Sequence, residues 1–204
     1  KPDHARVGEV LYRTAKELQG YISKLEEIRV PVIAAVHGGV IGGALDLITA
    51  CDMRFASNDA FFCIQEINIG MAADVGTLQR LPKIIPDSKM REMAYTGRRM
   101  LADEAKDSGL VGEVYETQDQ MLDAVHKLAA EIASKSPVAI YGLKAVMNYS
   151  RDHNVSDSLD FNALWSGAML SQTDMAEAMT AQMEKRDANF DKMVDVKKFN
   201  ESKS

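Results

Sequence analysis

Residues 31–46 read Pro31-Val-Ile-Ala-Ala-Val-His-Gly-Gly-Val-Ile-Gly-Gly-Ala-Leu-Asp46. The run from Val30 to Val36 is apolar, β-branched and too short for a helix, so it predicts a buried strand. A glycine-rich turn follows it. From Gly43 to Cys51 the sequence suits a helix that is apolar on nearly every side, as expected of an element in the centre of a domain. A strand, a turn and a buried helix in this order are typical of an α/β fold.

The flanking sequence extends this α/β pattern. Upstream, apolar residues recur at steps of three and four over residues 4–28, which predicts a helix with one buried face. Downstream, the patterns predict strands at Met53–Ala56, Ala60–Ile64 and Val111–Tyr115 and helices near residues 88–97, 102–108 and 119–134. From Pro137 onward the pattern is almost wholly helical. We therefore expect an α/β core over residues 1–136 and a helical C-terminal region over residues 137–204.

Composition excludes several classes of function. The chain has 204 residues and a net charge of −6, and its basic residues are scattered, which argues against a nucleic-acid partner. No apolar run approaches the roughly 20 residues that cross a bilayer, so no membrane association is expected. The four histidines and two cysteines have no metal-ligand spacing, and no metal site is predicted.

The paired glycines before Asp46 are a candidate oxyanion site. Glycine lets backbone amides approach a ligand closely, and the first turn of a helix presents amides without intrahelical acceptors. Taken alone, such glycines are better explained by tight packing or a turn, because short glycine motifs have many false positives. Asp46 favours a functional site, since an acid inside an apolar helix is rarely buried unless it is paired or functional.

Several motifs in register resemble the crotonase (enoyl-CoA hydratase/isomerase) family. The central motif spans Ile33 to Asp46 and is followed by Ala50-Cys-Asp-Met-Arg54. The family's order and spacing continue in Phe61-Phe-Cys-Ile-Gln-Glu66, Asn68-Ile-Gly70, Gly76-Thr-Leu-Gln-Arg-Leu-Pro82, Ser136-Pro137 and Lys144. The resemblance covers nearly the whole chain. It implies a crotonase-like spiral of ββα units with a helical C-terminal layer that forms trimers.

The resemblance also implies the chemistry of the glycine turn. Gly43 would supply one backbone N–H to an oxyanion hole that holds the oxygen of an acyl-CoA thioester as it becomes an enolate. The second donor would come from a loop upstream of Lys1. Ala44, where many relatives have glycine, is a departure from the pattern. Because the coenzyme A thioester itself carries the activation, the substrate is the expected partner and no metal or further cofactor is implied.

Three acids define the expected reaction. Glu66 lies 20 residues after Asp46, which is the family's interval between its acid/base positions, and Asp74 lies 8 residues after Glu66. Hydratases of the family typically have Glu at both of the first two positions and a small glycine at the third. Asp46, Glu66 and Asp74 together resemble the Δ3,5-Δ2,4-dienoyl-CoA isomerase branch, which converts 3,5-dienoyl-CoA to 2,4-dienoyl-CoA in fatty-acid β-oxidation.

By this resemblance, Asp74 would act near C2 of the acyl chain, Glu66 near C6, and Asp46 would orient Glu66. From the residues alone, Asp74 is almost as well explained as a helix N-cap. A solvated loop charge is the weaker interpretation of Glu66, because Glu66 directly follows a strand in register with the motif. A 2-enoyl-CoA hydratase or a Δ3-Δ2-enoyl-CoA isomerase is the alternative activity. A non-catalytic acyl-CoA-binding or assembly module is the alternative of another class.

Assembly and location follow from the resemblance alone. It implies a homotrimer or homohexamer in mitochondria or peroxisomes, although the chain shows no targeting signal and starts without Met, as a truncated or processed chain would. Apolar residues at helical spacing suit either a subunit interface or an internal core; they are Leu159, Phe161, Leu164, Trp165, Met169 and Leu170. The sequence does not indicate the acyl-chain length.

Overall fold

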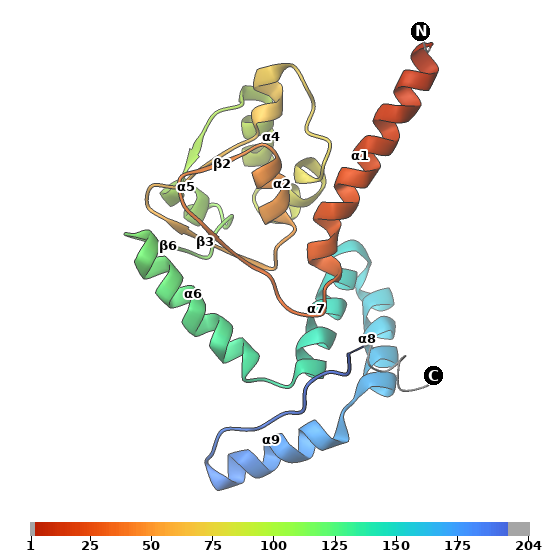
Figure 1. Ribbon diagram of the computed structural model, residues 1–204, viewed down its shortest axis with the longest axis vertical. Coiled ribbons are helices and arrows are strands. Elements are labelled where there is room, and N and C mark those ends of the chain that lie inside the picture. Colours follow the sequence, from red (N-terminus) through yellow and green to blue (C-terminus); the bar gives the residue numbers. More distant parts are fainter. Residues whose placement is uncertain (1–2, 196–204) are drawn as a thin grey trace. The chain divides into compact units, whose positions relative to one another are not determined.

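The computed structural model describes residues 3–195, and the chain separates into two compact units, Lys1–His126 and Lys127–Ser204 (Figure 1). The division falls inside the helix α6 (Gln118–Ala133), ahead of the boundary at residue 137 that the sequence predicts. None of the helices within residues 3–195 has both the length and the apolar character needed to cross a membrane.

Two small sheets form the centre of the first unit. One contains β1 (Ile33–Val36), β3 (Met53–Ser57) and β6 (Glu113–Tyr115), all parallel; the other contains β2 (Gly39–Ile41), β4 (Phe61–Cys63) and β5 (Met100–Leu101). β2 and β4 are parallel, and β5 pairs antiparallel with β4. Two strands and a helix therefore make one coil, β1-β2-α2, and the next coil, β3-β4-α3, stacks on it strand for strand.

The helices of the first unit complete its core. They are α1 (His4–Glu27), α2 (Gly43–Thr49), α3 (Thr77–Arg80), α4 (Asp87–Thr96) and α5 (Ala102–Asp107), with short 3-10 turns η1 (Gln65–Ile69) and η2 (Leu81–Lys83). The largest fully buried apolar side chains come from many of these elements and are Phe62, Leu45, Ile64, Leu81, Met93, Met100, Leu110 and Met121. The prediction of a buried α2 is confirmed, because Leu45, Asp46, Ile48 and Thr49 are all buried.

The predicted helix over residues 4–28 is confirmed as α1, but its predicted burial is not observed. No residue of α1 is buried, and Val10 and Leu11 are more than half exposed. The partly buried positions of α1 are Ala15, Gln19, Ile22, Ser23, Leu25 and Glu26. Three of these are polar, so the packed face of α1 is set by hydrogen bonds as well as by apolar contacts.

The glycine-rich turn after Val36 contains a strand that the sequence does not predict. Gly38 turns the chain with φ 60, and β2 begins at Gly39. The ring of Phe61 covers Gly39 so closely that a Cβ at this position would lie 2.9 Å from the ring. Glycine is therefore required there by the close approach of β4 and not by a turn.

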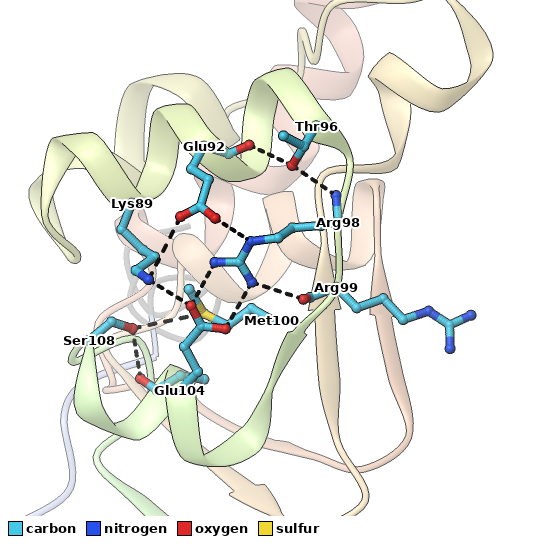
Figure 2. Close-up of polar contacts among 9 residues, drawn as sticks. Lys89, Glu92, Thr96, Arg98, Arg99, Met100, Glu104 and Ser108 are labelled. Atoms are coloured by element: carbon cyan, nitrogen blue, oxygen red, sulfur yellow. Dashed lines mark hydrogen bonds and ion pairs between the residues drawn. The ribbon is translucent and has the colours of Figure 1, made fainter.

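A network of charges joins α4, the residues before β5, and α5 (Figure 2). Arg98 donates to Glu104 at 2.6 Å and to Glu92 at 2.8 Å, and Lys89 donates to Glu104 at 2.7 Å. Hydrogen bonds from Arg98 and then Lys89 lower the pKa of Glu104 to about 2. Because these side chains are about one-third exposed, solvent screening limits what the network contributes to stability.

The second unit is helical, as the sequence predicts. It contains α7 (Pro137–Asp152), α8 (Val155–Met169) and α9 (Gln172–Glu184), which begin at the side-chain caps Ser136, Asn154 and Ser171. The ring of Trp165 meets Tyr141 edge to face at 4.9 Å. Trp165 and Phe161 are half-buried within this unit, whereas Leu159, Leu164, Met169 and Leu170 are exposed.

Candidate active site

The amino-terminal end of α2 is open to solvent at Gly43. Gly42 precedes the helix with φ 55, and its carbonyl accepts the first helical hydrogen bonds, from Leu45 at 2.7 Å and Asp46 at 3.2 Å. The amide of Gly43 comes before these bonds and so has no acceptor within the helix. Gly43 is exposed, and nothing lies within 4 Å of where a Cβ would stand. This amide can therefore donate to a ligand.

Glu66 lies directly against this end of α2. It is half-buried in η1, which follows β4, and its Oε1 is 3.0 Å from the position of a Cβ on Gly42. The backbone around it is fixed, because the Glu66 carbonyl accepts a hydrogen bond from Met71 at 2.9 Å. The carboxylate of Glu66 therefore lies against Gly42, the residue directly before the open amide of Gly43.

Asp46 is buried in α2, with 1% of its surface exposed. Its Oδ1 accepts a hydrogen bond from the amide of Thr77, the first residue of α3, at 2.5 Å. The sequence predicts that Asp46 orients Glu66, but the hydrogen bond found for its carboxylate goes to the next coil of the spiral. Asp46 thus holds the start of α3, three residues after Asp74, against α2.

Asp74 is exposed, and the alternative reading of it as a helix N-cap is wrong. The helix α3 begins at Thr77 and its N-cap is Gly76, with φ 143 and no side-chain cap. The amide that a cap would satisfy is taken by Asp46. The backbone carbonyl of Asp74 accepts a hydrogen bond from the side-chain amide of Gln19 in α1, at 2.7 Å.

These contacts tie the segments that carry all three acids to α2. Asp46 lies in the first turn of α2, and Glu66 lies against Gly42, the residue before α2. The hydrogen bond from Thr77 to Asp46 ties the Asp74 segment to the same helix. An apolar cavity of about 290 Å³ lies beside the chain that joins Glu66 to Asp74. It is bounded by this chain, α3 and α4, and its lining includes Ile64, Ile67, Met71, Ala73, Leu78 and Met90.

Charged groups near Cys63 complete the surroundings of Glu66. Burial raises the pKa of the Cys63 thiol; Arg99 opposes this shift and Glu66 adds to it. The guanidinium of Arg99 lies 4.2 Å over the ring of Phe61 and points away from the Arg98 network (Figure 2).

In the part of the chain that the structure describes, no cluster of three or more His, Cys, Asp or Glu side chains could hold a metal ion.

Sequence reasoning did not find the partners of the acids. Gln19 is 55 residues away from Asp74, and Thr77 is 31 residues away from Asp46. Nothing in the local pattern distinguishes either residue, because a glutamine on a helix and a threonine at a helix start are both common. Only the spacing of the polar residues Gln19, Ser23 and Glu26 along one side of α1 hints at specific contacts.

Comparison with known proteins agrees with this fold. Residues 9–193 match the enoyl-CoA hydratase/isomerase family, and the chain belongs to that family. Two solved structures share its fold: a probable enoyl-CoA hydratase/isomerase from Mycobacterium abscessus (TM-score 0.83, 32% identity, 90% of this chain and 71% of that one) and an enoyl-CoA hydratase from Bacillus anthracis (TM-score 0.83, 28% identity, 89% and 70%). The crotonase-like fold that the sequence predicts is confirmed.

Particular relatives are more similar in sequence. A mitochondrial Delta(3,5)-Delta(2,4)-dienoyl-CoA isomerase of Mus musculus is 50% identical over 186 residues, which are 91% of this chain and 57% of the relative. A peroxisomal protein of the same name from Arabidopsis thaliana is 47% identical over 191 residues, which are 94% of this chain and 69% of the relative. The chain thus spans little more than half the length of the mouse enzyme.

Proposed function

We propose that this chain belongs to an isomerase that converts 3,5-dienoyl-CoA to 2,4-dienoyl-CoA. The observation that carries the proposal is the convergence of Asp46, Glu66 and the Asp74 segment on α2, which carries the open amide of Gly43. The identity of about 50% with an enzyme named for this reaction supports it. The acyl-CoA thioester is the substrate in this proposal, and no metal is required.

The amide of Gly43 would bind the thioester oxygen of the substrate. When a proton leaves C2, the electron pair passes into the conjugated system and negative charge develops on this oxygen. A backbone donor placed at a developing oxyanion typically contributes about 10²–10³ in rate. The exposed position of Gly43 leaves room for the ligand, because no protein atom lies within 4 Å on the side of its missing Cβ.

Two carboxyl groups would then move the protons. Asp74 takes the proton from C2, and a protonated Glu66 gives one to C6, so the double bonds shift from C3=C4 and C5=C6 to C2=C3 and C4=C5. The net result is one proton removed and one proton added.

The contact of Asp46 favours isomerisation over hydration. A hydratase needs two carboxyl groups that hold and activate a water molecule. Here Asp46 is buried and its Oδ1 is engaged by the amide of Thr77 at 2.5 Å. One of its two carboxylate oxygens is therefore engaged by the backbone, and in this proposal Asp46 supports the site without handling protons.

Three further features belong to the same proposal. The cavity of about 290 Å³ beside Ile67 and Met71 suits the apolar tail of the acyl chain. The exposed apolar residues of α8 suit a homotrimer or homohexamer. Relatives of this chain are named as mitochondrial and as peroxisomal enzymes, and we propose one of these two compartments.

The test is a comparison of two substrates with the full-length protein. A 3,5-dienoyl-CoA should be converted to its conjugated product, followed by ultraviolet absorption, with kcat/KM at least 100-fold above that for hydration of crotonyl-CoA. Rapid hydration with no isomerisation would favour the hydratase alternative. Binding of both thioesters without turnover of either would favour a non-catalytic module.

A further inference from the structure

One polar face of α1 holds the segment that carries Asp74. Gln19, Ser23 and Glu26 follow one another at steps of four and three residues and so lie on one side of the helix. All three are partly buried, and each makes a hydrogen bond to the segment from Asp74 to Arg80. The face of α1 that contacts the candidate active site is therefore built for specific polar contacts.

The far end of this segment is fixed by Arg80. Its guanidinium donates to Glu26 at 2.7 and 3.1 Å and to Ser23 at 2.9 Å, and the side chains of Arg80 and Glu26 are only 13% and 14% exposed. The guanidinium passes across Gly76, where a Cβ would lie 2.0 Å from it. Arg80 thus joins α3 to α1 without contacting Asp74.

The near end is fixed by Gln19. Its Nε2 donates to the carbonyl oxygen of Asp74 at 2.7 Å, which sets the plane of the peptide that joins Asp74 to Val75. Within residues 3–195 the carboxylate of Asp74 accepts no hydrogen bond of its own. The backbone that Gln19 holds therefore fixes the point from which the Asp74 side chain projects, while the carboxylate itself turns about χ1 and χ2.

We propose that Gln19 is a positioning residue for Asp74, which acts by fixing the peptide from which the Asp74 carboxylate projects. This inference rests on the proposed isomerase function, in which Asp74 removes the C2 proton. Displacement of a catalytic group by about 1 Å can cost on the order of 10²-fold in rate. Loss of this hydrogen bond should consequently lower kcat while substrate binding is kept.

The first experiment compares variants of α1 in the full-length protein. Gln19→Leu removes the donor at similar volume, and kcat should fall at least tenfold with KM changed less than twofold. Gln19→Lys keeps a donor and should recover kcat to within threefold of the wild type. Ser23→Ala is the matched control. It removes the hydrogen bond from Arg80 and the bond that the Ser23 hydroxyl donates to the backbone carbonyl of Gln19, but it leaves the bond from the Gln19 side chain to Asp74 in place, so its kcat should stay within twofold. A Gln19→Leu variant with kcat within twofold of the wild type would overturn the proposal.

A double-mutant cycle tests whether Gln19 acts through Asp74. In the Asp74→Asn background, Gln19→Leu should cost less than a further twofold in kcat, since the group that it positions is already lost. If Gln19→Leu lowers kcat by the same factor in both backgrounds, Gln19 acts elsewhere and the proposal fails.

A structural measurement separates this inference from the proposed function. The Val75 amide belongs to the same peptide as the Asp74 carbonyl that Gln19 holds. A crystal structure of Gln19→Leu should therefore show this peptide displaced by about 1 Å, whereas Ser23→Ala should keep it as in the wild type. If the wild type isomerises no dienoyl-CoA but the peptide moves in Gln19→Leu, the function is wrong and the contact stands. An unmoved peptide in Gln19→Leu would overturn the positioning role whatever the activity.

Discussion

The buried carboxylate of Asp46 accepts a hydrogen bond from the backbone amide of Thr77 at 2.5 Å. This bond joins the helix of one coil of the spiral to the helix of the next. It satisfies an amide at the start of α3 that its own N-cap, Gly76, cannot satisfy. Asp46 is therefore a structural residue of the site as well as a member of its acidic set.

Replacement of Asp46 with Ala should destabilise the protein. The amide of Thr77 would be left buried without an acceptor, which costs about 1–3 kcal/mol. Asp46→Asn keeps an acceptor oxygen and should cost less than half as much. Urea unfolding followed by circular dichroism measures both, and an Asp46→Ala variant within about 0.5 kcal/mol of the wild type would show that the bond contributes little.

Replacement of Asp74 with Asn should separate catalysis from stability. The amide cannot accept the C2 proton, so kcat for the dienoyl-CoA should fall by about 10²–10⁴ with KM little changed. Because Asp74 is exposed and caps no helix, the unfolding midpoint in urea should not move. Asp123→Asn, at an exposed position of α6, is the control for loss of a surface charge and should keep full activity.

Alanine at Gly42 and at Gly43 should have different effects. Gly42 has φ 55 and lies against Glu66, so Gly42→Ala should destabilise the protein by at least about 1 kcal/mol and displace the carboxylate. Gly43→Ala meets no atom and should keep wild-type stability. Its methyl group nevertheless points into the space proposed for the substrate, so its kcat/KM should fall. Thermal unfolding and the isomerase assay on the same preparations test this pair, and equal stability of the two variants would contradict the strain at Gly42.

Acid should weaken the charge network around Glu104. Its pKa is about 2 in the folded protein, below the value of 4.5 for the free side chain. A lowered pKa stabilises the fold above pH 4.5, and this contribution is lost as the pH falls from about 4.5 toward 2. Glu104→Gln should consequently lower the unfolding temperature at pH 7. Between pH 5 and pH 3 the unfolding temperature of this variant should fall by less than that of the wild type. Glu131→Gln, at an exposed position of α6, should follow the wild type across the same range.

Much of the fold follows from local sequence patterns. The limits of α1, the order of β1, α2, β3 and β4, and the helical C-terminal unit were all predicted, because long periodic segments and short apolar runs are the strongest local signals. β2 and β5 were not predicted. Each has only two or three residues, and both exist through their pairing with β4, which no local pattern records.

The candidate site was predicted only in part. The family resemblance of the motifs implied Gly43, Asp46, Glu66 and Asp74, and the structure ties their segments to α2. Their partners come from long-range contacts, such as Gln19 with Asp74 and Thr77 with Asp46. The prediction of a buried apolar face on α1 was wrong for the same reason, since periodicity identifies an apolar stripe but not the partner that covers it.

The parallel pairing of β2 with β4 also has an evolutionary consequence. Ile41 and Cys63 are the last matched pair of this ladder, and the chain leaves it from neighbouring positions, toward Gly42 on one strand and toward Glu66 on the other. The groups proposed to react follow the ends of the ladder in sequence and lie outside its matched pairs. A lineage can therefore exchange Glu66 or Asp74 for other residues, and so acquire a different reaction, while the sheet that carries them keeps every bond.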